Sequence, residues 1–160
     1  MLLLSGLDVA YGYIAARSSG TGTAATPPFL PPMGALAALQ YGLTAAPASQ
    51  PRSALLGQAT SGLIAVAMSY LPPDIVPTWT VRALAPAFGL AATVRLGIVH
   101  PPAGAAAVLL VSRRGNWALY GMLLLGTALS FLPAVVVNNL SYERQYPLYW
   151  GLLPRRRTQT

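Results

Sequence analysis

Long apolar stretches separated by short polar turns dominate the chain. The apolar stretches cover residues 1–16, 33–46, 53–71, 82–112 and 117–137, and few of their residues carry charge. A helix needs ~20 predominantly apolar residues to cross the hydrocarbon core of a bilayer, a length that residues 53–71 and 117–137 match. The pattern therefore predicts an all-α, polytopic membrane protein with about four to five spans.

The stretch at residues 82–112 is too long to cross a ~30 Å core once at ~1.5 Å per residue. Two successive prolines, Pro101 and Pro102, remove two backbone donors inside it and push the preceding His100 out of the helical region. We therefore expect one helix that stops before His100 and a shorter helix over about residues 103–111. The chain should be broken at this Pro-Pro motif.

The pattern Pro-Pro-x-Gly-Ala-x-Ala-x-Leu occurs twice, at residues 31–39 and at residues 101–109. Either the match is chance in a chain rich in alanine, glycine and proline, or it marks two repeated halves, residues 1–71 and 82–138. Each half would hold three segments, so the second would be an inverted repeat of the first, as in transporters with broken helices. The two helix starts would then face one cavity with free amide donors and positive dipole ends. The residues placed there to contact an anion are Gly34, Ala35, Gly104 and Ala105.

Composition strengthens the membrane assignment. Hydrophobic residues make up 54% of the 160 residues and charged residues only 8%, against about 25% charged in soluble domains. So few polar groups could not cover the surface of a domain that folds in water. We expect one transmembrane domain over residues 1–160, with a weak first segment at 1–17 and a polar, aromatic tail at 139–160.

Charge and chemistry narrow the function classes. Ten arginines stand against three acidic residues, yet no basic stripe interleaved with aromatic residues indicates nucleic-acid binding. One histidine, three acids and no cysteine cannot build a usual zinc site, and no nucleophile–base pair or carboxylate dyad is apparent. We therefore expect no enzyme, no metal and no cofactor. The expected partners are the lipid bilayer, a small inorganic anion and, in a homo-oligomer, further copies of the chain.

Three side chains are candidates for an anion site. His100 either caps backbone groups that the prolines expose, or binds the anion and relays protons, because its ordinary pKa lies near neutrality. Arg52, which begins a full span, either anchors the helix at the interface or contacts the anion. Arg95 lies in an apolar run, where charge is costly and often functional, and it either snorkels or serves the site. Arg95 precedes His100 by about 500° of helical rotation, so the two should not share a face.

Other positions predict contacts between helices. Small residues recur every four positions in one span and favour close packing: Gly57, Ser61, Ala65 and Ser69. Asn138 and Asn139 either cap carbonyls at the end of the last span or close the cavity. Pro133 is expected to kink that span.

The order of several short motifs resembles the HPP family of integral membrane proteins over about residues 33–150. The motifs are Met33-Gly34-Ala35, Gln50-Pro51-Arg52, Gly57-Gln58, His100-Pro101-Pro102-Ala103-Gly104-Ala105, Val137-Asn138-Asn139 and Gln145-Tyr146-Pro147. The resemblance implies a compact helical fold, usually described as four spans, and transport, with nitrite the substrate proposed for plastid and cyanobacterial members. The chain departs from the family where threonines are common, having Leu96, Ile98 and Ala106. A path lined by these positions would be less polar.

We therefore expect a membrane transporter or channel for a small anion, most simply nitrite. The alternative is a membrane scaffold or assembly subunit without flux. The two differ in whether the proline breaks meet in a polar cavity or pack dry. The resemblance is compatible with a plastid envelope, a bacterial inner membrane or a fungal membrane, and arginine counts on the two sides do not fix the topology.

Overall fold

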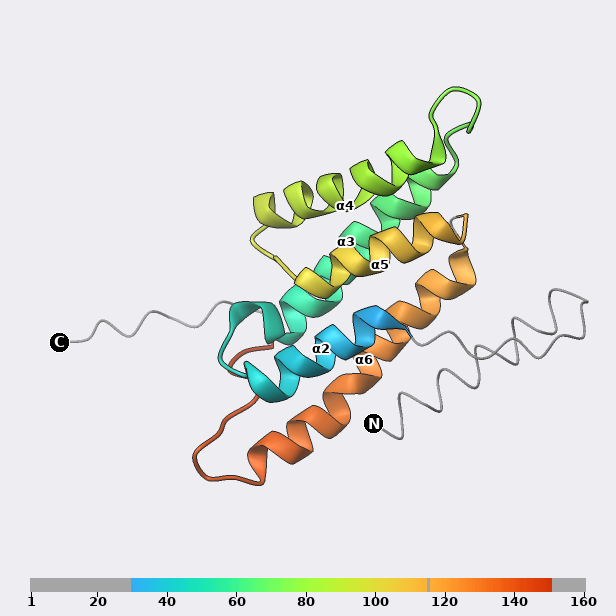
Figure 1. Cartoon of the computed structure of the whole chain (residues 1–160). Coiled ribbons are helices and arrows are strands. Elements are labelled where there is room, and N and C mark those ends of the chain that lie inside the picture. Colours follow the sequence, from blue (N-terminus) through green and yellow to red (C-terminus); the bar gives the residue numbers. More distant parts are fainter. Residues whose placement is uncertain (1–29, 115, 151–160) are drawn as a thin grey trace, which may run out of the picture.

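The computed structural model describes residues 30–114 and 116–150, so the weak first segment at 1–17 and the end of the tail lie outside the described residues. Within these ranges the chain forms α-helices and one short 3-10 helix and no strand, which confirms the all-α class. The elements are α2 (Pro31–Gly42), η1 (Pro47–Ser49), α3 (Pro51–Ser69), α4 (Thr78–Arg95), α5 (Pro101–Ser112) and α6 (Trp117–Asn139) (Figure 1).

The chain breaks between α4 and α5, as the double proline predicts. α4 ends at Arg95, and the next residues reverse direction through Gly97, whose φ of 65° is readily adopted by glycine. The amide of Ile98 donates to Thr93 O at 2.9 Å and the amide of Gly97 donates to Val94 O at 3.1 Å. These are the two bonds of a Schellman motif, which satisfies carbonyls left free at a helix end.

The short helices begin at Pro31 and Pro101, as the repeated Pro-Pro motif predicts, because a proline at the first helical positions gives up amides that have no partner in the helix. The angular argument about Arg95 and His100 assumed one continuous helix. Since α4 ends at Arg95, their relative positions are set by the loop instead.

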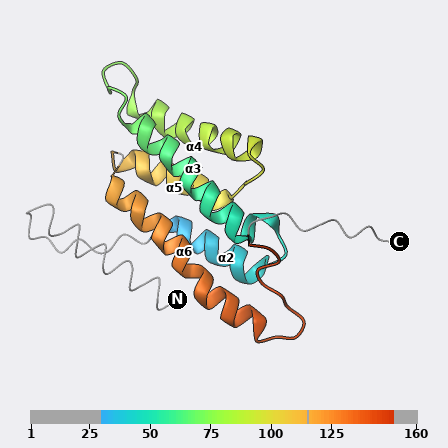
Figure 2. The same ribbon diagram turned by 180° about the vertical axis from the view of Figure 1, so that it is seen from behind.

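The two short helices pack against each other near their starts and run away from that point in opposite directions (Figure 1 and Figure 2). Leu30, Met33 and Leu36 on the α2 side are buried, as are Ala103 and Ala106 on α5. The longer helices α3 and α6 are also antiparallel (Figure 1). The start of α6 lies beside the end of α3, where Trp117 Nε1 donates to the hydroxyl of Tyr70 at 2.8 Å.

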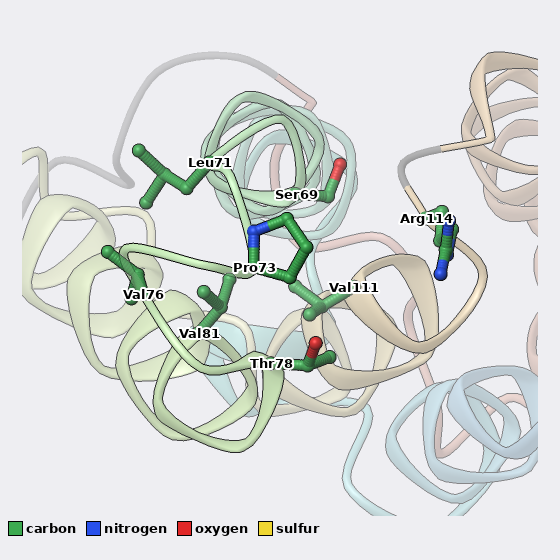
Figure 3. Close-up of a pocket in the computed structure, with 8 residues that line it drawn as sticks. All are labelled: Ser69, Leu71, Pro73, Val76, Thr78, Val81, Val111 and Arg114. Atoms are coloured by element: carbon green, nitrogen blue, oxygen red, sulfur yellow. The ribbon is translucent and has the colours of Figure 1, made fainter.

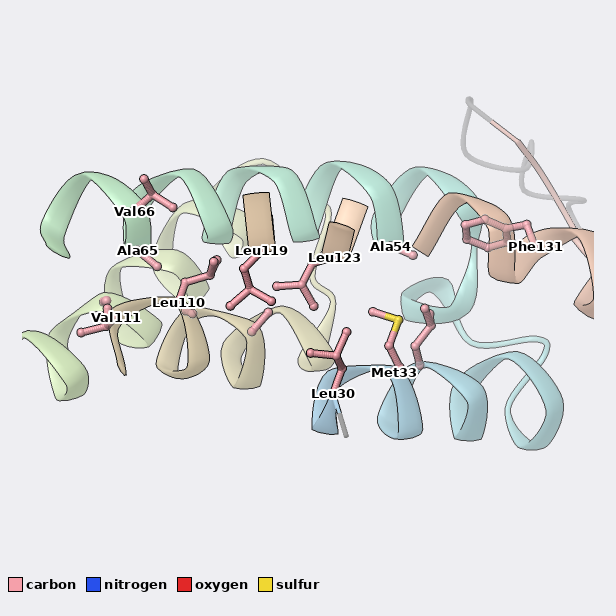
Figure 4. Packing of buried hydrophobic residues seen from close by; sticks show 14 of the residues in the cluster. Leu30, Met33, Ala54, Ala65, Val66, Leu110, Val111, Leu119, Leu123 and Phe131 are labelled. Atoms are coloured by element: carbon pink, nitrogen blue, oxygen red, sulfur yellow. The ribbon is translucent and has the colours of Figure 1, made fainter. Parts of the chain in front are cut away.

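Helix α3 is the centre of the bundle and contacts α4, α5 and α6. Its small residues allow this close approach. Of the predicted packing stripe, Gly57, Ser61 and Ala65 are buried, which confirms the prediction for these three, whereas Ser69 is half-buried. A Cβ added at Gly62 would lie 2.6 Å from the ring of Tyr120, and Ser61 lies against Gly89 of α4. Leucines from α5 and α6 fill the remaining core beside Ala65 and Val66 (Figure 4).

The outer faces of the helices are apolar. Exposed large residues include Phe88, Leu90, Leu125, Leu132 and Val136. Of the described helices, α6 alone is long and apolar enough to cross a membrane by length and composition, and it continues through Pro133. An apolar exterior of this kind is typical of a surface that meets lipid rather than water.

Candidate functional site

The candidate site is the start of α5, where His100 is held on one side of its ring. Its Nδ1 lies 2.8 Å from the carbonyl oxygen of Ala48 in η1. His100 is 3% exposed, and its Nε2 is buried without a hydrogen-bond partner among the described residues. Since a carbonyl only accepts, Nδ1 must carry the proton, and the neutral ring presents a lone pair at Nε2.

The close approach of α3 to this segment depends on Gly57. A Cβ added there would lie 2.7 Å from the carbonyl oxygen of Ile98 and 2.8 Å from the Cβ of His100. A longer side chain would therefore push the histidine segment off α3. His100 makes no side-chain hydrogen bond to the start of α5, so the structure does not show the capping alternative, and the ring binds the carbonyl of Ala48 instead.

His100 lines a pocket of about 400 Å³ between α3, α4 and the start of α5. The lining residues are Ser61, Pro86, Ala87, Leu90, Thr93, Val99, His100, Pro101, Ala103 and Gly104. Most of them are apolar, and His100 is the one ionisable group in the lining. A side chain of this lining can therefore become positively charged in one way, when Nε2 of His100 gains a proton.

The two hydroxyls in the lining are already committed as donors. Ser61 Oγ donates to Ala103 O at 3.2 Å, and Thr93 Oγ1 donates to Leu90 O at 2.9 Å. Both oxygens keep lone pairs and can act as acceptors toward a ligand. The polar groups of the pocket are thus acceptors unless the histidine gains a proton.

The expected rows of free amides at the helix starts are largely absent among the described residues. Two prolines at the head of each short helix carry no N–H. The next amide in each is bonded to the N-cap carbonyl, from Met33 to Leu30 O at 2.8 Å and from Ala103 to His100 O at 3.0 Å. What the two helix starts still offer an anion is the positive end of the helix dipole.

The sequence-predicted site residues are brought together only in part. His100 and Gly104 line the pocket, whereas the other candidates do not. Exposed outer faces carry Gly34, Ala35, Ala105 and Arg95, and Arg52 is half-buried in the first turn of α3. Sequence reasoning missed Thr93 as a lining residue, and it assigned Ser61 to helix packing alone.

Asn138 and Asn139 bind backbone groups outside the pocket. Asn138 Nδ2 donates to Gln40 O at 2.9 Å, and Gln40 Nε2 in turn donates to Ser130 Oγ at 2.8 Å, so α2 is tied to α6 by buried polar groups. Asn139 Oδ1 accepts from the amide of Tyr146 at 3.1 Å, and Asn139 Nδ2 donates to the carbonyl of the same residue. Their geometry fits the carbonyl-binding alternative.

A second, smaller pocket of about 100 Å³ lies at the other end of the bundle, by the α3–α4 loop (Figure 3). Its polar lining comes from Ser69, Thr78 and Arg114, above a floor that includes Val81 and Val111. Arg114 is exposed and has a φ of 52° after the end of α5. This pocket does not include any residue that the sequence proposed for an anion site.

A broken helix beside a buried histidine, in a bundle with an apolar exterior, is the architecture of a helical integral membrane protein. Residues 2–147 match the family described as "HPP, transmembrane region", and the chain belongs to this family. The match confirms the resemblance drawn from the short motifs.

Two curated relatives, both from Dictyostelium discoideum and both named transmembrane protein, are 32% and 30% identical to this chain over 125 residues. The alignments cover 72% of this chain but 43% and 39% of the relatives, so the chain spans about two fifths of their length. No solved structure matches the chain. Family and relatives agree on an integral membrane protein, while the identity of the membrane stays a prediction.

Proposed function

We propose that the protein is a transporter or channel, not an enzyme, and that it carries a small anion together with a proton held by His100. Nitrite is the first substrate to test. The observation that carries the proposal is His100, which lines the pocket, is fixed at Nδ1 by Ala48 and has a buried Nε2 without a partner among the described residues.

The arrangement of the helices supports a path at this point. A short helix followed by a long one occurs in both halves, and the corresponding helices run antiparallel, as expected for an inverted repeat. In this interpretation the starts of α2 and α5 lie near the middle of the membrane. Two positive dipole ends meeting there would repel cations and favour an anion.

The state of the histidine supports a coupled proton. The neutral ring offers only a lone pair at Nε2, which repels an anion, whereas the protonated ring offers a donor and a positive charge. No other ionisable side chain lines the pocket. Anion and proton should therefore bind together, and transport should increase as the pH falls and the protonated fraction grows.

The test is flux into proteoliposomes with nitrite, nitrate or chloride at a series of pH values. Nitrite alone is ambiguous, because its neutral acid crosses bilayers unaided, so each rate is compared with empty liposomes. The acids of nitrate and chloride are ionised throughout this range and lack that leak. We expect protein-dependent flux that increases at low pH.

Two variants locate the path, with a third as the control. His100→Ala should lower the protein-dependent rate and flatten its pH response. Arg52→Ala should mainly weaken the apparent affinity, because this half-buried arginine lies outside the pocket lining and would act on the anion only through its positive charge. Arg113→Ala removes an exposed arginine beyond the end of α5 and should behave as wild type. If His100→Ala folds and carries the ions as wild type does, the proposed path is wrong.

The second candidate, a scaffold without flux, is favoured by the mostly apolar lining of the pocket. It predicts that wild-type liposomes do not differ from empty ones for any of the three ions. The same experiment therefore decides between the two functions.

A further inference from the structure

Three of the family-like motifs lie outside the pocket lining and meet around η1. They are Gln50-Pro51-Arg52, Val137-Asn138-Asn139 and Gln145-Tyr146-Pro147. Tyr146 is 1% exposed, and its hydroxyl donates to Ser49 O at 2.6 Å. Its ring stacks on Phe131, with centroids 6.5 Å apart. Asn139 holds both backbone groups of Tyr146, and Gln50 Oε1 accepts the amide of the tail residue Leu148 at 2.9 Å. The tail after α6 is therefore fastened to the turn before α3.

Successive carbonyls of η1 accept from side chains that arrive from different parts of the chain. Ala48 O receives Nδ1–H of His100, and Ser49 O receives the hydroxyl of Tyr146. Gln50 fixes the turn further, because its Nε2 donates to Thr44 O at 2.7 Å. The carbonyl of Ala48 that binds His100 therefore immediately precedes the carbonyl that the tail binds.

We propose that Tyr146 is a positioning residue for His100, acting through η1. By holding Ser49 O, it fixes the turn so that Ala48 O keeps the Nδ1 proton in place, which leaves Nε2 as the site that gains a proton. Without this hold the carbonyl turns away and the ring proton redistributes between the two nitrogens. The role in transport rests on the proposed function, but the effect on the ring does not.

A nearby charge could also change which ring nitrogen of His100 carries the proton, but the groups around the ring are uncharged. Nδ1 of the ring binds η1 at Ala48, the Cβ of His100 lies beside Gly57 of α3, and the α4 and α5 residues that line the same pocket are uncharged. The hydroxyl of Tyr146 is itself neutral at ordinary pH, because burial raises its pKa. A change in the ring after a change at Tyr146 therefore reports geometry rather than a new charge.

The chain contains a single histidine, so nitrogen NMR on protein labelled with ¹⁵N-histidine reports on His100 alone. The full chain is purified in detergent through a tag without histidine. Tyr146→Phe removes only the hydroxyl and keeps the ring stack. Tyr142→Phe is the matched control, because Tyr142 lies in the same tail and is fully exposed. Asn139→Ala is the second variant, because it removes the hydrogen bonds that hold the backbone of Tyr146 and leaves the tyrosine hydroxyl in place.

We expect wild type and Tyr142→Phe to show the Nδ1–H tautomer. Tyr146→Phe and Asn139→Ala should each lower the ratio of Nδ1–H to Nε2–H by at least about twofold, the scale of coupling within one hydrogen-bonded network. An unchanged ratio in a folded Tyr146→Phe protein overturns the proposal, and so does an equal change in Tyr142→Phe. If Tyr146→Phe does not fold, an unchanged ratio in Asn139→Ala overturns it. A shifted ratio in a protein without anion flux would refute the transport function and keep the positioning role.

Discussion

Replacing Gly57 with alanine should loosen the attachment of the histidine segment to α3. The added Cβ would lie 2.7 Å from Ile98 O and 2.8 Å from the Cβ of His100, and a backbone oxygen cannot rotate away as a flexible side chain can. Overpacking of this kind costs about 1–3 kcal/mol. Alanine returns up to about 1 kcal/mol as the better helix former. With the full return, we expect a net loss of up to about 2 kcal/mol in the free energy of unfolding.

Thermal unfolding in detergent measures this loss. At about 2–4 °C per kcal/mol for a chain of this size, the Tm of Gly57→Ala should fall by up to about 8 °C. Gly121→Ala is the matched control, because a Cβ at Gly121 in α6 would meet no atom within 4 Å. Its Tm should stay level or rise slightly. If Gly57→Ala melts as high as Gly121→Ala, the segment at residues 98–100 does not touch α3.

Two further substitutions test the packing around the site and the polar tie between α2 and α6. Ser61→Leu should lower the Tm in detergent by steric clash, because Ser61 lies between Gly89 and the carbonyl of Ala103, and wild-type melting would contradict this placement. Asn138→Ala should destabilise the protein by about 1–3 kcal/mol, because it leaves the buried carbonyl of Gln40 without this donor. A denaturant midpoint equal to that of wild type would show that the bond contributes nothing.

Local chemistry made part of this fold predictable. Two adjacent prolines lack amide hydrogens and cannot continue a helix from the residues before them, so a break before α5 could be predicted from Pro101 and Pro102 alone. The small-residue stripe likewise predicted a contact face, and Ser61 lies on it. The end of α4 was not predicted, because Arg95 in the last turn and Gly97 after it were not recognised as a helix stop.

The site was less predictable than the helices, because three separate elements build it. Thr93 joins His100 across a loop, and Ser61 comes from α3, so no single motif contains them. The double prolines imply lost amides, yet the use of the following amide by the N-cap carbonyl appears only in three dimensions. The sequence order of the Gln50, Asn139 and Tyr146 motifs gave no sign that they meet around one turn.

The shortness of α2 and α5 also bears on how the protein reaches the membrane. Each has 12 residues, or about 18 Å of helix against a hydrocarbon core of ~30 Å, so neither can be held across the bilayer by its own length. Among the described helices α2 leaves the ribosome first, and its packing partners α5 and α6 leave it last. α2 therefore lacks these contacts until the second half of the chain has been made. The final position of α2 thus depends on helices that are synthesised much later. A chain interrupted before α5 would lack the helices against which α2 packs.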